Sequence, residues 1–357
     1  MRELGAELRR WHAANTAYAL ATVVSVTGSA PRLPGAAMAV DESGNVRGSL
    51  SGGCVEGAVY ELCREVLASG EPVRRRFGFS DADAFAVGLT CGGELEVFVQ
   101  RIAAEDYPVV ETALGSGPVA IVRDLESGRM AALGPGGVVG AAFDTAVLRR
   151  AAAMLDAGAS GVRVVGCAEE ERSVFVESFA PAPRMIICGA TDFTTALCRV
   201  GNLLGYRVTV CEARPAFADH ARMPEADEVV RQWPHRYLRH AEVDARTVIC
   251  VLTHDPKFDI PVLTEALRLP VAYVGAMGSR RADSERRLRL RAAGLTDAEL
   301  LRLHSPIGLE LGGQTPEETA VSIAAEIVAV RRGGSARSLS TTTRPIHPEF
   351  PVTEASA

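Results

Sequence analysis

The stretch RMIICGATDFTTALCRVGNLLGYRVTVCEARP, residues 184–215, decides the fold of the C-terminal half. Apolar runs at 184–188 and 207–211 read as strands, and they flank a helical stretch at 193–204. The same alternation continues downstream, with strands predicted at 228–230, 247–252 and 271–274 and helices at 259–268, 280–292 and 316–331. This pattern is typical of a doubly wound parallel sheet. We therefore expect a Rossmann-like domain over residues 184–332.

The half before it mixes strands and helices differently. Residues 1–105 predict an N-terminal α+β domain, with strands at 18–26, 36–41, 73–79 and 95–100 and a helix at 55–68. Residues 106–183 predict a connecting α+β module and linker, with strands at 119–124, 162–165 and 173–178 and one helix near 145–157. Residues 333–357 are rich in Gly, Ser, Thr and Pro and are predicted to be disordered. The fold class is thus α/β.

Composition excludes several classes of protein. The chain has 357 residues, a net charge of −6 and a pI near 5.8, which argues against a general nucleic-acid binder. It contains no uncharged apolar stretch long enough to span a membrane, and its start has no apolar signal-peptide core, so we expect a cytoplasmic protein. None of the eight cysteines forms a CxxC pair, which disfavours a structural zinc site.

In open α/β sheets, ligands bind beyond the carboxyl ends of the strands, so the loops there are the first candidates for a site. The loop at 188–194 has Gly189 but carries Thr at 191 and 194, where a dinucleotide fingerprint wants Gly. NAD(P) is therefore disfavoured. Glu212, after the next strand, could bind ribose hydroxyls, whereas Arg214 favours a phosphate. A plain surface charge pair explains both residues equally well.

Two later loops carry more chemistry. LTHDPKFD, residues 252–259, brings together His254, Asp255 and Lys257, which is the only Lys among 38 basic residues. His and Asp can exchange protons, and a compact ammonium suits a phosphate better than a planar guanidinium would. VGAMGSRR, residues 274–281, is typical of an anion site at a helix start, with backbone freed at Gly275 and Gly278, a cap at Ser279 and a cation at Arg280. Ordinary turn formation and helix capping are the alternatives.

The motif HSPIGLELGGQTPEETA, residues 304–320, is explained in part by helix capping. Thr315, Pro316 and Glu318 form a capping box. His304 and Ser305 are left without an assigned role.

The N-terminal half has two cysteines in glycine-rich loops. Cys54 follows Gly52 and Gly53 where a helix is predicted to begin, and a helix start lowers a thiol pKa. Cys91 precedes Gly92 and Gly93. A third loop carries Arg32 between two prolines and suits an anionic ligand, although a solvated turn is the alternative. We interpret five of the six remaining thiols as inert packing groups, namely Cys63, Cys167, Cys198, Cys211 and Cys250.

Taken in order, these motifs resemble the XdhC/CoxI family of molybdenum-enzyme maturation factors. The resemblance covers residues 12–332 and rests on GSAPRLPGAAM, GSLSGGCVEGAVYE, GLTCGGELEVF, VTVCEARPAFA, THDPKFD, YVGAMGSRR and HSPIGLELG with TPEETAVSIAAEI. It implies an XdhC/CoxI domain followed by a Rossmann-like domain. It also implies binding of molybdenum cofactor, as molybdopterin or its cytosine dinucleotide form, and help in sulfurating, protecting and inserting it into a xanthine dehydrogenase- or CO dehydrogenase-type hydroxylase.

The resemblance also assigns residues and partners. Cys54 and Cys91 correspond to cofactor contacts that could ligate molybdenum, and the loops at 189–192 (with Asp192), 254–257 and 275–281 correspond to ligand loops. It implies an apo molybdenum hydroxylase and a cysteine desulfurase as partners, and a homodimer would fit. Turnover is not implied.

Two other functions stay open. The strand–helix pattern and Glu212 fit an NAD(P)-dependent oxidoreductase. Cys54 at a helix start fits a persulfide-carrying sulfurtransferase. Cys54 and Asp255 are the candidate catalytic residues.

Overall fold

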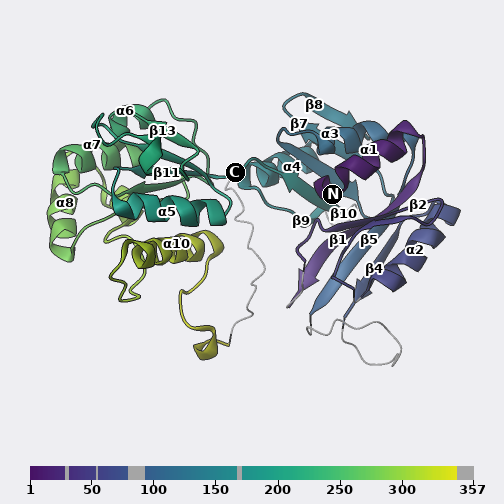
Figure 1. The fold of residues 1–357 in the computed structure, drawn as a ribbon. Coiled ribbons are helices and arrows are strands. Elements are labelled where there is room, and N and C mark those ends of the chain that lie inside the picture. Colours follow the sequence, from purple (N-terminus) through teal and green to yellow (C-terminus); the bar gives the residue numbers. More distant parts are fainter. Residues whose placement is uncertain (29–31, 54, 79–92, 167–170, 344–357) are drawn as a thin grey trace. The chain divides into compact units, whose positions relative to one another are not determined.

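The computed structural model describes residues 1–28, 32–53, 55–78, 93–166 and 171–343. The chain divides into two compact units, Met1–Pro181 and Ala182–Thr342 (Figure 1). Each unit has hydrophobic cores of its own. Within the described ranges, no helix is both long and apolar enough to cross a membrane.

The second unit is a parallel sheet with the strand order β13-β12-β11-β14-β15-β16. Its strands are β11 (Arg184–Cys188), β12 (Arg207–Cys211), β13 (Glu228–Val230), β14 (Val248–Val251), β15 (Tyr273–Ala276) and β16 (Leu303–His304). The first strand of this unit, β11, lies in the middle of the sheet. The chain continues outward through β12 to β13 and then returns to form β14 on the other side of β11. The loops after β11 and β14 therefore diverge at a topological switch point. The predicted Rossmann-like fold is confirmed.

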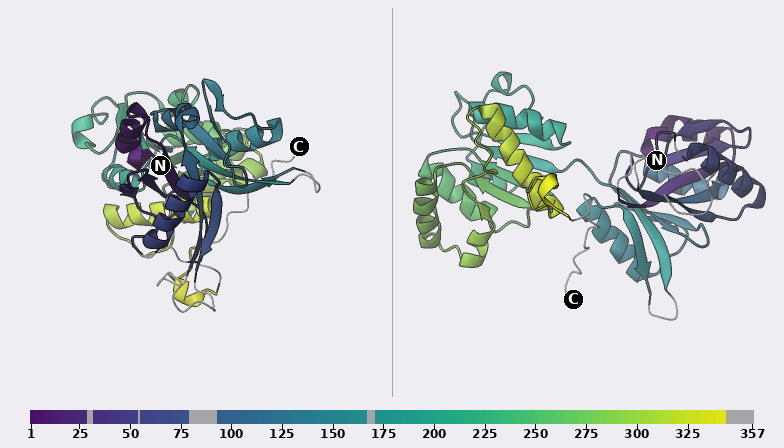
Figure 2. Two further views of the ribbon diagram at one scale, coloured as in Figure 1. Left: turned by 90° about the vertical axis from the view of Figure 1, so that its right-hand side faces the viewer. Right: turned by 90° about the horizontal axis from the view of Figure 1, so that it is seen from below.

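Helices cover both faces of this sheet. They are α5 (Asp192–Leu203), α6 (Pro234–Leu238), α7 (Pro256–Ala266), α8 (Arg280–Ala292), α9 (Asp297–Leu301) and α10 (Pro316–Arg332). Met185 and Ile187 of β11 pack with α5 and α10, whereas Ile186 faces α7 and α8. Figure 2 shows α10, in yellow, across the first of these faces. The alternation of β11 between two apolar layers explains why its residues form a continuous hydrophobic run.

The first unit contains the same topology twice. One half comprises α1 (Gly5–Ala13), β1 (Tyr18–Thr27), β2 (Ala37–Asp41), β3 (Val46–Gly48), α2 (Glu56–Ser69), β4 (Val73–Phe77) and β5 (Glu94–Ile102). The other comprises α3 (Tyr107–Leu114), β6 (Val119–Asp124), β7 (Met130–Gly134), β8 (Gly137–Gly140), α4 (Thr145–Ala157), β9 (Gly161–Val165) and β10 (Arg172–Phe179). Their antiparallel sheets have the orders β3-β2-β1-β5-β4 and β8-β7-β6-β10-β9. Residues 106–183, expected to be a connecting module and linker, thus contain a second copy of the fold of the first half.

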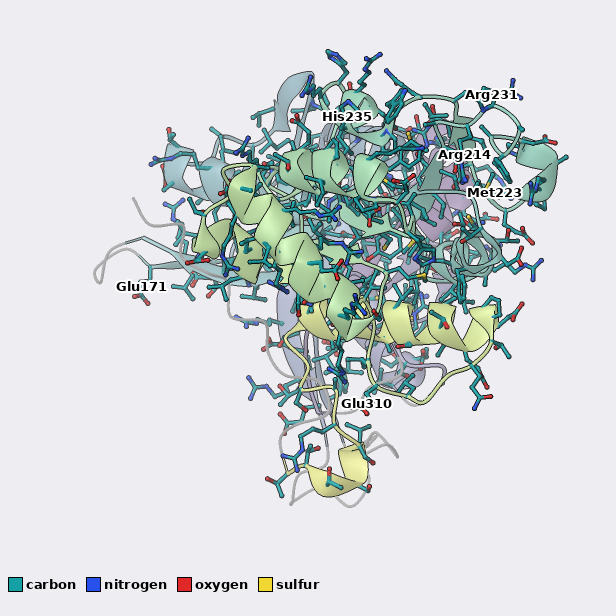
Figure 3. The ribbon with its side chains drawn as sticks, turned by 90° about the vertical axis from the view of Figure 1, so that its left-hand side faces the viewer. Glu171, Arg214, Met223, Arg231, His235 and Glu310 are labelled. Carbon is teal, nitrogen blue, oxygen red and sulfur yellow. The ribbon has the colours of Figure 1, made fainter. Side chains whose placement is uncertain are left out.

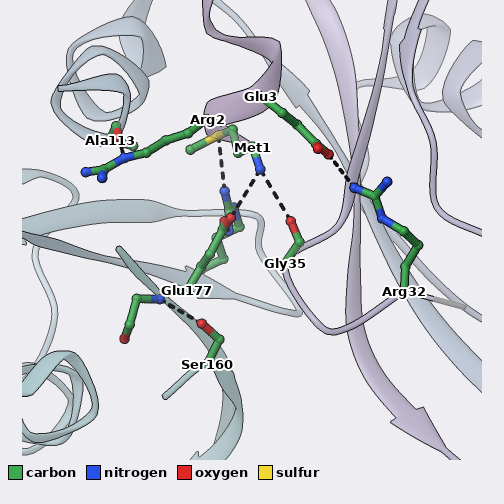
Figure 4. A network of polar contacts seen from close by, with 10 residues as sticks. Met1, Arg2, Glu3, Arg32, Gly35, Ala113, Ser160 and Glu177 are labelled. Carbon is green, nitrogen blue, oxygen red and sulfur yellow. Dashed lines mark hydrogen bonds and ion pairs between the residues drawn. The ribbon is translucent and has the colours of Figure 1, made fainter. Parts of the chain in front are cut away.

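The two halves share a core, and Met1 of the first half joins a buried ion pair of the second. Leu8 and Tyr18 from the first half pack with Val110 and Ile121 from the second. The Arg123 guanidinium, which is fully buried, donates to Glu177 at 2.7 Å. The Met1 amino group lies 3.5 Å from the same carboxylate (Figure 4). Burying these charges requires such pairing, since an isolated buried charge is costly.

Candidate functional site

The loops after β11 and β14 approach closely at the carboxyl edge of the parallel sheet. Gly189 follows β11 with φ of +103°, and a Cβ built there would lie 2.7 Å from Thr253 Cγ2. Only glycine accommodates both the dihedral angle and this contact. Gly189 therefore brings the two loops together at the switch point where a ligand is expected.

Glu212, after β12, is already occupied. Its carboxylate accepts hydrogen bonds from the Ala190 amide at 2.9 Å, from the Arg214 amide at 2.8 Å and from the Arg214 guanidinium at 2.9 Å. Burial would raise the pKa of Glu212, but these hydrogen bonds outweigh it and lower the pKa. Arg214, which is labelled in Figure 3, also lies over the Phe217 ring, 4.3 Å from its centroid. The carboxylate predicted to bind ribose is thus engaged within the protein.

The start of α5 is also engaged. The Thr191 amide donates to Thr194 Oγ1 at 3.2 Å, and Thr194 Oγ1 donates to the Gly189 carbonyl at 2.7 Å. Asp192 is exposed in the first turn and puts a negative charge where a pyrophosphate would approach. The two threonines that depart from the dinucleotide fingerprint therefore cap the helix.

The loop after β14 uses two of its predicted residues to begin α7. Asp255 caps the helix by accepting from the Lys257 amide at 3.0 Å, and its other oxygen lies 3.1 Å from Lys257 Nζ. The Lys257 side chain is 62% exposed, and its ammonium lies 4.9 Å from the Phe258 ring centroid. His254 is exposed at the same edge. Lys257 remains reachable by a ligand, although its charge is partly balanced by Asp255.

The loop after β15 begins α8. Ser279 caps this helix, as predicted, by accepting from the Ala282 amide at 3.2 Å, and Arg280 is exposed beside it. Gly275 lies inside β15, where a Cβ would come within 2.5 Å of Ile307. Gly278 has φ of +152°, and a Cβ there would lie 3.2 Å from the Arg286 guanidinium. Both glycines thus make room for neighbouring side chains.

A cavity of about 160 Å³ lies between α7 and α8. It is lined by His254, Pro256, Asp259, Ile260, Ala282, Glu285, Arg286 and Arg289. Only His254 among these belongs to the residues predicted from the sequence. The cavity is too small for a whole cofactor, because pockets for drug-sized ligands measure roughly 300–1,000 Å³. It can hold one part of such a ligand.

A buried ion pair forms the polar side of this cavity. The Asp259 and Arg286 side chains are 5% and 6% exposed and lie 3.0 Å apart. Arg286 also donates to Ser305 Oγ at 2.8 Å and to the Met277 carbonyl at 2.7 Å, and Thr253 donates its hydroxyl to Asp259. Burial raises the pKa of Asp259. The network links the segments after β14, β15 and β16 into one edge, and it gives Ser305 a structural partner.

The sequence alone did not single out Asp259 or Arg286 as site residues, for different reasons. Asp259 lies within the conspicuous loop LTHDPKFD, but its place inside a predicted helix made it inconspicuous. Arg286 sits in the run RRADSERRLRLR, where several arginines face solvent and nothing in the pattern distinguishes the buried one. His304, also without an assigned role, lies 3.3 Å from the Glu326 carboxylate and stacks on Tyr273.

In the first unit, the Glu56 carboxylate organises residues 49–53, the described part of the loop before α2. Six described groups of residues 49–53 donate to it, and so does the Val55 amide. The donors are Ser49 Oγ (2.7 Å), the Leu50 (3.1 Å), Ser51 (2.9 Å), Gly52 (3.0 Å) and Gly53 (2.9 Å) amides, Ser51 Oγ (2.7 Å) and the Val55 amide (3.2 Å). Burial would raise the pKa of Glu56, but these hydrogen bonds hold the pKa well below its usual range. The Gly52 and Gly53 amides are thus directed at an internal anion.

Several predicted residues of this unit cannot be placed. Cys54, Cys91 and Gly92 lie outside the described residues, as do Cys167 and the tail from residue 344. Gly93 is buried just before β5, and Arg32 pairs with Glu3 at 2.6 Å (Figure 4). Among the residues that the structure describes, no group of three His, Cys, Asp or Glu side chains could hold a metal ion.

Comparison with known protein families gives a match in each of the two units. Residues 185–327 match the XdhC Rossmann domain, and residues 11–78 match the XdhC and CoxI family. The chain belongs to the XdhC and CoxI family. The two matched ranges together cover more than half of it, and each falls within one of the two units.

Two named bacterial proteins and a solved structure match most of the chain. A protein from Bacillus subtilis named as a probable xanthine dehydrogenase subunit is 29% identical over 88% of this chain and 93% of its own. The molybdenum cofactor insertion chaperone PaoD from Escherichia coli is 25% identical over 87% of this chain and 83% of its own. A crystal structure of a xanthine dehydrogenase from Bacillus halodurans matches with a TM-score of 0.61 and 25% identity, over 95% of this chain and 98% of that chain.

Proposed function

We propose that this chain binds molybdenum cofactor and assists its insertion into a xanthine dehydrogenase-type hydroxylase. The observation that carries the proposal is the match, across both units, to a relative named as a molybdenum cofactor insertion chaperone. In this role the cofactor is cargo, and its phosphate and pterin must be held without being consumed.

The carboxyl edge of the Rossmann unit supports this role. Lys257 and Arg280 are exposed there beside the starts of α7 and α8, where cations and helix termini favour a phosphate. The buried Asp259–Arg286 pair holds that edge in one arrangement. A rigid edge with exposed cations suits reversible binding of an anionic cargo.

The direct test is binding followed by transfer. The purified full-length chain is titrated with molybdenum cofactor, with fluorescence as the readout, and the loaded protein is then mixed with an apo-hydroxylase. We expect saturable binding and recovery of hydroxylase activity. Wild-type protein that binds no cofactor would contradict the proposal. Lys257→Arg tests the loop, because a planar fork should replace a compact ammonium poorly.

The finer steps of the proposal concern sulfur and assembly. Cys54 and Cys91 are proposed to protect or ligate molybdenum, since a thiolate is a soft ligand suited to it. A Cys54→Ser, Cys91→Ser double variant that binds cofactor normally would exclude this. A cysteine desulfurase is the proposed sulfur source, and mass spectrometry after incubation with one distinguishes a persulfide on Cys54 from sulfur on bound cofactor. A homodimer is the proposed assembly, to be checked by analytical ultracentrifugation.

An NAD(P)-dependent oxidoreductase is the second candidate, favoured by the strand order of the parallel sheet. The engaged Glu212 carboxylate and the acidic first turn of α5 weigh against it. Saturable binding of NADH or NADPH with hydride transfer would establish this function instead.

A further inference from the structure

The cavity between α7 and α8 combines apolar walls with charges of both signs. Pro256, Ile260 and Ala282 supply the apolar surface. Asp259 and Glu285 supply carboxylates, and Arg286 and Arg289 supply guanidinium groups. Two carboxylates in so small a space disfavour a phosphate, which the exposed cations at the neighbouring helix starts attract better. The lining therefore fits a neutral group that both donates and accepts hydrogen bonds.

The buried pair has hydrogen-bonding capacity to spare. The two terminal nitrogens of Arg286 donate to Ser305, Asp259 and Met277, while no residue of the described chain accepts from its Nε–H. Each Asp259 oxygen accepts one hydrogen bond, from Thr253 or from Arg286, although a carboxylate oxygen can accept two. The buried pair thus retains both a donor and an acceptor, and both of its residues line the cavity.

An amino-oxo-pyrimidine ring has the matching edge. Its carbonyl oxygen accepts from a guanidinium, and its amino group donates to a carboxylate, as in the pairing of Arg with guanine and of Asp or Glu with cytosine. Its flat faces suit Ile260 on α7 and Ala282 on α8. The volume of about 160 Å³ fits such a head group and leaves the remainder of the ligand outside.

We propose that this cavity binds the amino-oxo-pyrimidine ring of the cargo, with Asp259 and Arg286 reading its hydrogen-bonding edge. The proposal rests on the proposed function and adds to it the part of the cofactor that is recognised. Such a ring occurs both in the pterin of the cofactor and in the base of a nucleotide form. The experiment below separates these two sources.

The test uses the full-length chain and isolated ring compounds. Fluorescence titration with 6-hydroxymethylpterin forms one arm, and direct calorimetric titration with cytidine or guanosine monophosphate forms the other. We expect one arm to show saturable binding, which identifies the source. Ala282→Leu adds an apolar side chain to the cavity wall and keeps both charged groups of the buried pair, and it should weaken binding about 10-fold or more, as expected for losing a well-placed pair of hydrogen bonds. Ala292→Leu, on the exposed end of the same helix, is the matched control.

Asp259→Asn offers a second, chemical variant, because the amide keeps the shape and loses half of the acceptors. We expect it to weaken binding of the ring while circular dichroism shows a folded protein. Wild-type protein that binds neither ring compound would overturn the proposal, as would equal binding by wild type and Ala282→Leu. Titration with whole cofactor distinguishes failure of the ring site from failure of the proposed function. Equal cofactor binding by wild type and Ala282→Leu would refute the ring site but leave the chaperone role intact. No cofactor binding by wild type would refute that role.

Discussion

The Asp259 carboxylate lies 3.0 Å from the Arg286 guanidinium, and both side chains are almost wholly buried. The pair joins α7 to α8 at the carboxyl edge of the parallel sheet. Removing one partner leaves an uncompensated buried charge, which costs about 3–5 kcal/mol. We predict that Asp259→Ala lowers the free energy of unfolding by roughly that amount in urea denaturation.

An exposed pair on the same helix provides the control for this prediction. Arg281 and Glu285 lie 3.2 Å apart, with side chains that are 89% and 55% exposed. Exposed pairs contribute about 0–1 kcal/mol, so Arg281→Ala should leave stability nearly unchanged. An Asp259→Ala, Arg286→Met double variant should recover part of the loss, since no charge stays buried. Equal effects of Asp259→Ala and Arg281→Ala would show that the buried pair is unimportant.

Close approach at the switch point leads to a second prediction. Gly189 and Gly205 both have positive φ, +103° and +77°, but only Gly189 has neighbours within reach of a Cβ. Gly205→Ala should cost about 1 kcal/mol for the backbone alone. Gly189→Ala should cost roughly 1–3 kcal/mol more, because the new methyl group overlaps Thr253. Thermal or urea unfolding of the two variants measures the difference, and equal losses would mean that the loops yield easily.

Local patterns predicted the elements of the Rossmann unit well. The strands at 184–188, 207–211 and 228–230 and the helix at 280–292 coincide with the observed ones, and the Thr315 capping box forms as expected. Apolar runs and caps act over a few residues, so they are visible in sequence. The internal repeat of the first unit was not predicted, because α3 and the β7–β8 hairpin, which complete the second copy, were not recognised in the sequence.

Features of the candidate site were predictable only where polar or charged residues lie in loops between predicted strands and helices. Ser279 was correctly expected to cap a helix, and the fold rule indicated the loops at the carboxyl edge as candidates for the site. The partners of Glu212 and Glu56 depend on backbone amides, whose directions no residue type specifies. Burial of Arg286 among exposed arginines depends on how α8 meets α7, which is a property of packing.

Buried thiols provide a third prediction. Burial raises the pKa of Cys63, Cys198 and Cys211 to about 12 in each case. The reactive thiolate is therefore scarce at pH 8, and access is blocked as well. We predict that the native protein at pH 8 leaves these three cysteines unmodified by an alkylating reagent, whereas all three react in urea. Peptide mass mapping checks the result, and rapid native labelling of any of them would contradict the described packing.

The Glu56 carboxylate gives a pH-dependent prediction. Its pKa in the folded protein is held well below the ordinary value of 4.5, so it contributes stability above pH 4.5 and loses that contribution as the pH falls toward the lower folded value. Glu56→Gln replaces one acceptor oxygen by an amino group that faces the loop's own N–H donors. Hydrogen bonds to a charged acceptor contribute about 1.5–3 kcal/mol each, so we expect a loss of at least 2 kcal/mol near pH 7.

The difference in free energy of unfolding between wild type and Glu56→Gln should become smaller as the pH falls below 4.5, because protonated Glu56 resembles the amide. Glu61→Gln, on the exposed face of the same helix, should change stability little at any pH. The chain has two Trp residues, and Trp11 lies in the first unit together with this loop. Tryptophan fluorescence in a Trp233→Phe background therefore reports on urea unfolding of that unit. A constant difference between wild type and Glu56→Gln from pH 7 to pH 3 would show that the carboxylate's charge is not what holds the loop.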